Sequence, residues 1–166
     1  ASVLGYVDSH DDPLQARFQG NGGIAFDTVG NLVICDYSAR LRYFNVSGNR
    51  SVSTMITRGD VSGFSPWSIA ADTYSASAPL RGCFYMTQWN TNVIWRLVGE
   101  VLTVLRAGPP GTNDGTIGDG IASIYSIGCG LAVTNAGHVA FLDLNSTVGL
   151  VRTTNFDTGV TETVAG

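Results

Sequence analysis

Residues 23–36 read GIAFDTVGNLVICD, and residues 40–42, which follow shortly after, read RLR. Two apolar runs separated by a glycine turn predict a β-hairpin, because glycine readily adopts the positive φ that a tight turn needs. The run LVICD is almost continuously apolar, which predicts a strand covered on both faces. This stretch therefore indicates one half of a buried antiparallel sheet.

The same order of strands occurs three times along the chain. First strands are expected at residues 23–27, 68–72 and 130–134, and second strands at 32–36, 83–87 and 139–143. Third strands are expected at residues 40–44, 93–97 and 150–153, and fourth strands at 52–57, 101–106 and 160–164. Four short strands recurring at a period of about 50 residues predict an all-β fold, a β-propeller of three four-stranded antiparallel blades. The blades are expected at residues 1–59, 60–108 and 109–166.

The first copy resembles the NHL repeat in its order of Gly-Ile-Ala-x-Asp, x-Gly-Asn-Leu-x-Ile-x-Asp and Arg-Leu-Arg. The final residues 163–166, TVAG, resemble the usual ending of that repeat. Residues 5–8 with 16–18, echoed by 113–115 with 122–125, resemble the linker between such repeats. In the middle copy, Thr87 takes the place of the usual aspartate and Trp95 that of the usual basic residue.

Three blades cannot close a ring, because propellers need roughly four to eight blades for each to pack on two neighbours. An open arc would leave two apolar sheet faces exposed. NHL propellers commonly have six blades, so the resemblance implies a partial propeller or half of a six-bladed ring. We expect either further blades of a longer chain or a homodimer to complete it.

The loops between second and third strands are the expected ligand surface, because propellers bind at one end of their strands. Tyr37 and Trp89 offer rigid aromatic area with a polar handle, although both could merely cover a blade edge. The full set of expected ligand-binding residues is Tyr37, Ser38, Arg40, Gln88, Trp89, Asn90, Asn92 and Asn145.

Asp36 and Asp143 occupy equivalent repeat positions, as do Arg42 and Arg152. A repeated acid and base suggests a structural device, in which the carboxylate accepts backbone N–H groups and the arginine braces a neighbouring strand. The acidic linkers at residues 8–12 and 113–120 lack the spacing of a calcium-binding EF-hand loop and are expected to be solvated turns.

We expect a non-catalytic module that binds a protein or small-molecule ligand, as the resemblance implies. The alternative is part of a propeller enzyme of the lyase or hydrolase type whose metal and catalytic residues lie in missing blades. The only histidines of this chain are His10 and His138, and the sequence has no motif with metal-ligand spacing, so neither a metal nor a cofactor is expected.

Charge and composition limit the classes of partner that this chain is expected to bind. The net charge is −4 and all nine cations are scattered arginines, which does not favour nucleic acid. No apolar run approaches the roughly 20 residues of a membrane span. The chain has three cysteines, Cys35, Cys83 and Cys129, so at least one is unpaired within the chain. All three lie in apolar, strand-like stretches and are expected to be small buried hydrophobic residues. Three glycosylation sequons favour an extracellular or cell-surface location.

Overall fold

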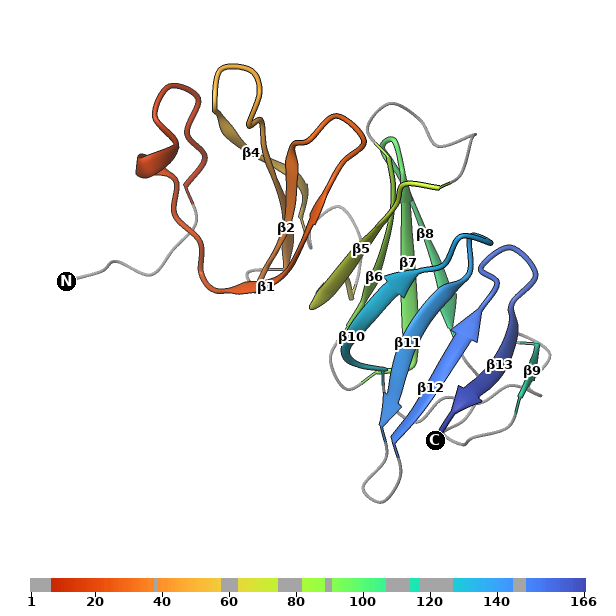
Figure 1. Cartoon of the computed structure of the whole chain (residues 1–166). Coiled ribbons are helices and arrows are strands. Elements are labelled where there is room, and N and C mark those ends of the chain that lie inside the picture. The colour runs from red at the N-terminus through yellow and green to blue at the C-terminus, as the bar shows by residue number, and fades with distance from the viewer. Residues whose placement is uncertain are drawn as a thin grey trace.

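A computed structural model describes residues 7–37, 39–57, 63–74, 82–88, 91–106, 114–116, 127–144 and 149–166. The described residues form β-strands and one short 3₁₀-helix, η1 (Pro13–Gln15). The strands belong to three separate antiparallel sheets that follow one another along the chain (Figure 1). The all-β prediction and its repeated four-stranded sheets are confirmed.

The four main strands of each sheet follow chain order, so each of these strands is joined to its neighbour by a local connection. The N-terminal sheet contains β1 (Asn21–Phe26), β2 (Leu32–Asp36), β3 (Arg40–Phe44) and β4 (Val52–Thr57). The middle sheet contains β5 (Ser68–Asp72), β6 (Cys83–Thr87), β7 (Val93–Val98) and β8 (Val101–Arg106). The C-terminal sheet contains β10 (Ile127–Val133), β11 (Val139–Leu144), β12 (Gly149–Thr154) and β13 (Val160–Ala165), and the two-residue strand β9 (Gly115–Thr116) extends its outer edge.

Glycine forms the predicted turns of the two outer hairpins. Gly30, between β1 and β2, has a φ of 86°, and Gly137, between β10 and β11, has a φ of 75°. These are left-handed backbone angles that glycine adopts without steric cost. Both hairpins also contain an irregularity in the first strand, between Asn21 and Ile24 and between Ile127 and Leu131.

The strand register defines which residues of the three sheets are equivalent. Ile24 pairs with Ile34, Ile69 with Met86 and Leu131 with Phe141. Those β2, β6 and β11 residues pair in turn with Arg42, Trp95 and Arg152. Trp95 therefore occupies the predicted arginine position.

The register also corrects the sequence alignment of the middle copy by one residue. Asp36 lies two residues after Ile34, and Asp143 lies two residues after Phe141. The corresponding position after Met86 is Gln88, whereas the sequence alignment placed Thr87 there. The connection between β5 and β6, residues 73–82, is longer than the turns of the other two hairpins, so sequence spacing could not fix this register.

Each sheet has two faces, which we name from their residues. The leading face carries Ile34, Met86 or Phe141 in the three sheets, and the trailing face carries Val33, Tyr85 or Ala140. Side chains alternate between the faces because a β-strand has a period of two.

The sheets pack leading face against trailing face. Val33, Cys35 and Leu41 of the N-terminal sheet share one core cluster with Met86 and Trp95 of the middle sheet. Tyr85 and Ile94 of the middle sheet share a second cluster with Val139 and Phe141 of the C-terminal sheet. Contacts between sheets run mainly through their first strands, β1 with β5 and β5 with β10. All three sheets are thus stacked in the same sense.

A glycine pair allows the N-terminal and middle sheets to approach closely. The Gly23 amide donates a hydrogen bond to the Trp67 carbonyl oxygen at 2.6 Å. A Cβ atom on Gly22 would overlap that same oxygen. Within the described residues, the chain holds no helix with the length and apolar character needed to span a bilayer.

Candidate functional site

A fully buried arginine organises the N-terminal sheet. Arg42 lies 2.8 Å from Asp8 and 3.4 Å from Asp36. Its guanidinium also donates to the carbonyl oxygens of Val7, at 2.9 Å, and Arg17, at 3.0 Å. The charge is therefore paired and hydrogen-bonded, as a buried arginine requires.

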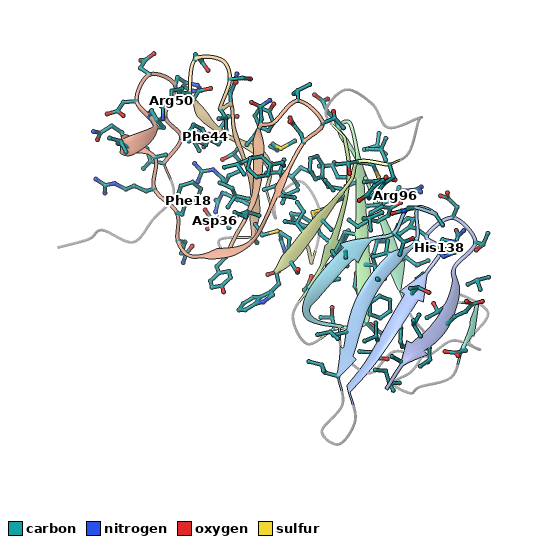
Figure 2. The ribbon with its side chains drawn as sticks, viewed as in Figure 1. Phe18, Asp36, Phe44, Arg50, Arg96 and His138 are labelled. Carbon is teal, nitrogen blue, oxygen red and sulfur yellow. The ribbon has the colours of Figure 1, made fainter. Side chains whose placement is uncertain are left out.

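The same network fastens the segment before β1 to the sheet. The Phe18 ring lies 5.0 Å from the Arg42 guanidinium carbon, and the Gln19 amide donates to Asp36 Oδ1 at 3.1 Å. Figure 2 labels Phe18 and Asp36 close together on the N-terminal sheet. Asp36 thus accepts a hydrogen bond from a backbone N–H and forms an ion pair with Arg42. Both contacts agree with the structural role that was expected from the repetition of this aspartate.

The C-terminal sheet repeats this arrangement. Arg152 is fully buried, 2.9 Å from Asp143 and 3.1 Å from Asp114. Desolvation raises the pKa of Asp114, but hydrogen bonds from Thr163 and the Arg152 charge outweigh it, so the pKa of that carboxyl lies below its usual value. Asp8 plays the equivalent part in the N-terminal sheet, where it accepts hydrogen bonds from the Thr54 amide and hydroxyl.

The middle sheet replaces the ionic network with aromatic packing. Trp95 is buried, and the Phe64 ring meets it edge to face with centroids 5.4 Å apart and an interplanar angle of 89°. Such edge-to-face pairs are favourable because the positive ring edge faces the negative ring face. Arg42, Trp95 and Arg152 therefore hold their sheets together, and we name their shared register position the scaffold position.

An exposed pair of aromatic side chains lies at the end of the sheets where β2 ends. Tyr37, directly after β2, is 45% exposed and stacks on Trp67 with centroids 4.5 Å apart and an interplanar angle of 13°. The Tyr37 amide donates to the Gly20 carbonyl oxygen at 3.0 Å, and the Trp67 amide donates to the Thr87 carbonyl oxygen at 2.8 Å. Backbone hydrogen bonds thus anchor both members of an aromatic pair that joins the N-terminal and middle sheets.

The other expected ligand-binding residues are divided between described and undescribed parts of the chain. Arg40 begins β3 and is half-buried, while Gln88 and Asn92 are half-buried at the corresponding end of the middle sheet. The Gln88 carbonyl oxygen accepts a hydrogen bond from Thr91 Oγ1 at 3.0 Å. Ser38, Trp89, Asn90 and Asn145 lie outside the described residues.

Trp67 belongs to this surface and was not among the expected residues. It precedes β5, so a search confined to loops between second and third strands could not include it. A signal was nevertheless present: Pro66-Trp67 places a large aromatic residue immediately before a first strand, where chain ends of neighbouring sheets meet. We name Tyr37, Trp67 and Gly20 the aromatic site.

Residues able to hold metal ions are dispersed. The described residues contain no group of three His, Cys, Asp or Glu side chains that could hold a metal. His10 is exposed near η1, whereas His138 is half-buried in the β10–β11 turn. Arg96 and His138 appear at the same end of the molecule in Figure 2, where Arg96 forms an ion pair with Asp157.

The two described thiols, Cys35 and Cys83, are free and buried. Burial raises the pKa of both thiols, which keeps them protonated and unreactive. This agrees with the expected role of these cysteines as small hydrophobic residues. The side chain of Cys129 lies outside the described part of the chain.

No protein-family model and no curated protein matches this chain. Among solved structures, its fold is similar to a structural genomics protein of unknown function from Bacteroides thetaiotaomicron, with a TM-score of 0.61 and 19% identity. The match covers 88% of this chain and 36% of that protein, so the chain spans about a third of its structural neighbour. The likeness concerns the fold alone.

Proposed function

We propose that this chain is a segment of an NHL-type β-propeller. Three features support the proposal: four antiparallel strands per sheet, leading-to-trailing packing, and contacts concentrated at the first strands. In a propeller the first strand of each blade lies nearest the central axis, so first strands of neighbouring blades meet. The match to about a third of a longer structure agrees with a segment of a larger assembly.

We infer that the segment is a non-catalytic recognition module and that its ligand, a protein or a small molecule, binds at the aromatic site. The observation that carries this proposal is the exposed stack of Tyr37 on Trp67. Stacking and backbone anchoring hold the Tyr37 ring in one orientation, so little conformational entropy is lost when a ligand contacts it. Aromatic residues held in this way are common anchors of binding surfaces.

The experiment selects phage-displayed peptides and a small-molecule library on the immobilised chain and measures the affinity of each hit by calorimetry. Tyr37→Ala should weaken binding at least tenfold, or about 1.4 kcal/mol, because the exposed ring is the proposed anchor. Tyr37→Phe, which keeps the stack, should retain most of the affinity of apolar contacts.

Tyr74→Ala is the matched control. Tyr74 is another exposed tyrosine, but it follows β5 and therefore lies at the opposite end of the sheets. Its replacement should leave the affinity unchanged. Hits that bind equally well to the wild type and to Tyr37→Ala, or that lose affinity only with Tyr74→Ala, would overturn the proposal.

A further inference from the structure

In the N-terminal and C-terminal sheets, an extended segment of the chain covers the free side of the fourth strand. The Ser9 amide donates to the Val52 carbonyl oxygen at 2.9 Å, and the Val52 amide donates to the Ser9 carbonyl oxygen at 2.6 Å. Gly115 pairs with Thr161 at the equivalent place in the C-terminal sheet. Each covering segment belongs to the stretch of chain that leads into the first strand of the same sheet.

An aspartate fixes each covering segment to its strand. Asp8 accepts a hydrogen bond from the Thr54 hydroxyl at 2.9 Å, and Asp114 accepts one from the Thr163 hydroxyl at 2.8 Å. Both threonines pair with the arginine at the scaffold position of their sheet. In the middle sheet, the residue that pairs with the scaffold position is Val104. Apolar residues therefore replace both the threonine and the arginine there.

The free side of β8, at the outer edge of the middle sheet, is open (Figure 1). No described residue pairs with it, and Val101 and Val104 are 65% and 42% exposed. Charges, proline and bulges usually protect such an edge from pairing with another strand. The pairings of β4 and β13 each contain an irregularity, whereas the six β7–β8 pairs are regular. Arg106, at the end of β8, is its only charged residue, and the strand has no proline. This edge therefore has the features of a pairing site.

The edge of β8 lacks a cover because the chain that leads into the middle sheet is short. The covering residue stands 15 positions before Ile24 in the N-terminal sheet and 16 before Leu131 in the C-terminal sheet. The same count back from Ile69, the equivalent residue of the middle sheet, reaches residues 53–54, which are already part of β4. The stretch that covers an edge in the other two sheets is thus used as a strand of the neighbouring sheet.

We propose that β8 is a docking strand for an extended segment of another protein, which pairs with it as a fifth strand. Both covers within this chain are local, and the local stretch is occupied here, so the open edge is assigned to a partner. Leu102 is the equivalent of Val52, so its N–H and C=O groups face the free side, and those of Val104 do so as well because a strand has a period of two.

The apolar character of this edge selects the sequence of the partner segment. The partner residue that takes the place of Asp8 lies against Val104 and near Trp95. A carboxylate at that place would meet neither a threonine hydroxyl nor an arginine, so we expect an apolar residue. This surface is separate from the aromatic site, and the inference does not depend on ligand binding there.

The experiment selects phage-displayed peptides on the immobilised Tyr37→Ala chain, which keeps β8 but lacks the ring proposed as the ligand anchor. Calorimetry then measures the affinity of each hit. Val104→Pro should weaken binding about tenfold or more, because proline removes an N–H that faces the free side. Val104→Thr keeps that N–H and should change the affinity less than about threefold. Aspartate in place of the peptide residue opposite Val104 should also weaken binding about tenfold.

Amide hydrogen exchange of the wild-type chain, followed by nuclear magnetic resonance, gives a readout that needs no variant to fold. A bound peptide should slow the exchange of the Leu102 and Val104 amides, because both then donate to the added strand. The Val52 amide already donates to Ser9 and should not change. Circular dichroism and the midpoint of thermal unfolding check that the Val104 variants fold.

A selection that yields no peptide would overturn the proposal, and so would hits that leave the Leu102 and Val104 amides unprotected. Pairing of two copies through β8 would also overturn it, because the edge would then belong to a second copy of this chain. Light scattering detects that outcome as a doubled mass that Val104→Pro abolishes. None of these outcomes changes the affinity of ligands that depend on Tyr37, so failure of this inference is distinguishable from failure of the proposed ligand site.

Discussion

The N-terminal and C-terminal sheets bury an arginine between two carboxylates, whereas the middle sheet buries a tryptophan against a phenylalanine at the same register position. Arg42 and Arg152 are fully buried and each pairs with two carboxylates, while Trp95 is buried in a cluster of apolar side chains. Arg42 and Trp95 both contact an aromatic residue from the segment before the first strand of their sheet. Phe18 lies over Arg42, and Phe64 lies against Trp95.

The difference teaches that this position requires volume, and that charge is acceptable only when the complete set of partners is present. One carboxylate that pairs with the arginine lies at the end of the second strand, as Asp36 does. The other comes from the linker beside the fourth strand, as Asp8 does. The middle sheet has the uncharged Gln88 in the first of these places. A buried cation without counter-charges would be strongly unfavourable, and an aromatic pair avoids that cost.

The largest expected effect comes from forcing the arginine into the middle sheet. Trp95→Arg removes the aromatic packing and buries a cation where the described neighbours of Trp95 form an apolar cluster, so it should destabilise the fold by about 4 kcal/mol or more. Urea unfolding monitored by circular dichroism measures the change. Trp95→Phe, which keeps an apolar ring, should cost clearly less. A loss below about 1 kcal/mol for Trp95→Arg would show that the middle sheet accommodates charge and would break the comparison.

An intermediate effect is expected when the ionic network of the N-terminal sheet is broken. Arg42→Met leaves two carboxylates without their cation and should cost about 3 kcal/mol. Adding Asp36→Asn removes one of those charges, so the double variant should be less destabilised than the sum of the single variants by about 2 kcal/mol. Arg17→Ala is the control, because that exposed side chain should change stability by no more than about 0.5 kcal/mol. Strict additivity would contradict a coupled network.

The smallest effect concerns the half-exposed carboxylate of the C-terminal network. Asp114→Asn should cost at most about 1 kcal/mol at neutral pH, because solvent screens the pair and the side chain is 48% exposed. The folded state lowers the pKa of Asp114, so its contribution is present above the ordinary aspartate range and is lost as the pH falls below about 4.

Unfolding measured from pH 7 to pH 2 tests this sign. The wild type should lose more stability than Asp114→Asn across the acid range, and the two curves should converge at its lower end. Asp11→Asn, an exposed carboxyl near η1, should follow the wild-type curve. A variant whose stability depends on pH as steeply as the wild type would exclude this role for Asp114.

Local patterns predicted the strands of this protein well, because alternation, apolar runs and glycine turns act within a few residues. The hairpin turns at Gly30 and Gly137 are examples. The alignment of the middle copy failed by one residue because a longer connection, residues 73–82, joins its first two strands, so sequence spacing did not fix which β6 residue pairs with Ile69. A one-residue slip exchanges the two faces of a strand, so this detail decides which side chains meet.

The candidate site was predicted only in part for a related reason. Tyr37 was recognised as an exposed aromatic residue after a second strand, but its partner Trp67 lies 30 positions away and in another sheet. The contact between them depends on the close approach of β1 and β5, which Gly22 and Gly23 allow. Sequence spacing alone contains no measure of that distance.

The sequence by itself determined that this chain is all-β, that its sheets repeat, and that Trp95 stands at the position of Arg42 and Arg152. These properties depend on the backbone preferences and side-chain alternation of short segments. Only the tertiary structure decided the sense in which the sheets stack, the meeting of Tyr37 with Trp67 and the exposure of Val101 and Val104. Those outcomes depend on which faces of distant strands exclude water together, and that choice is made only when whole sheets pack.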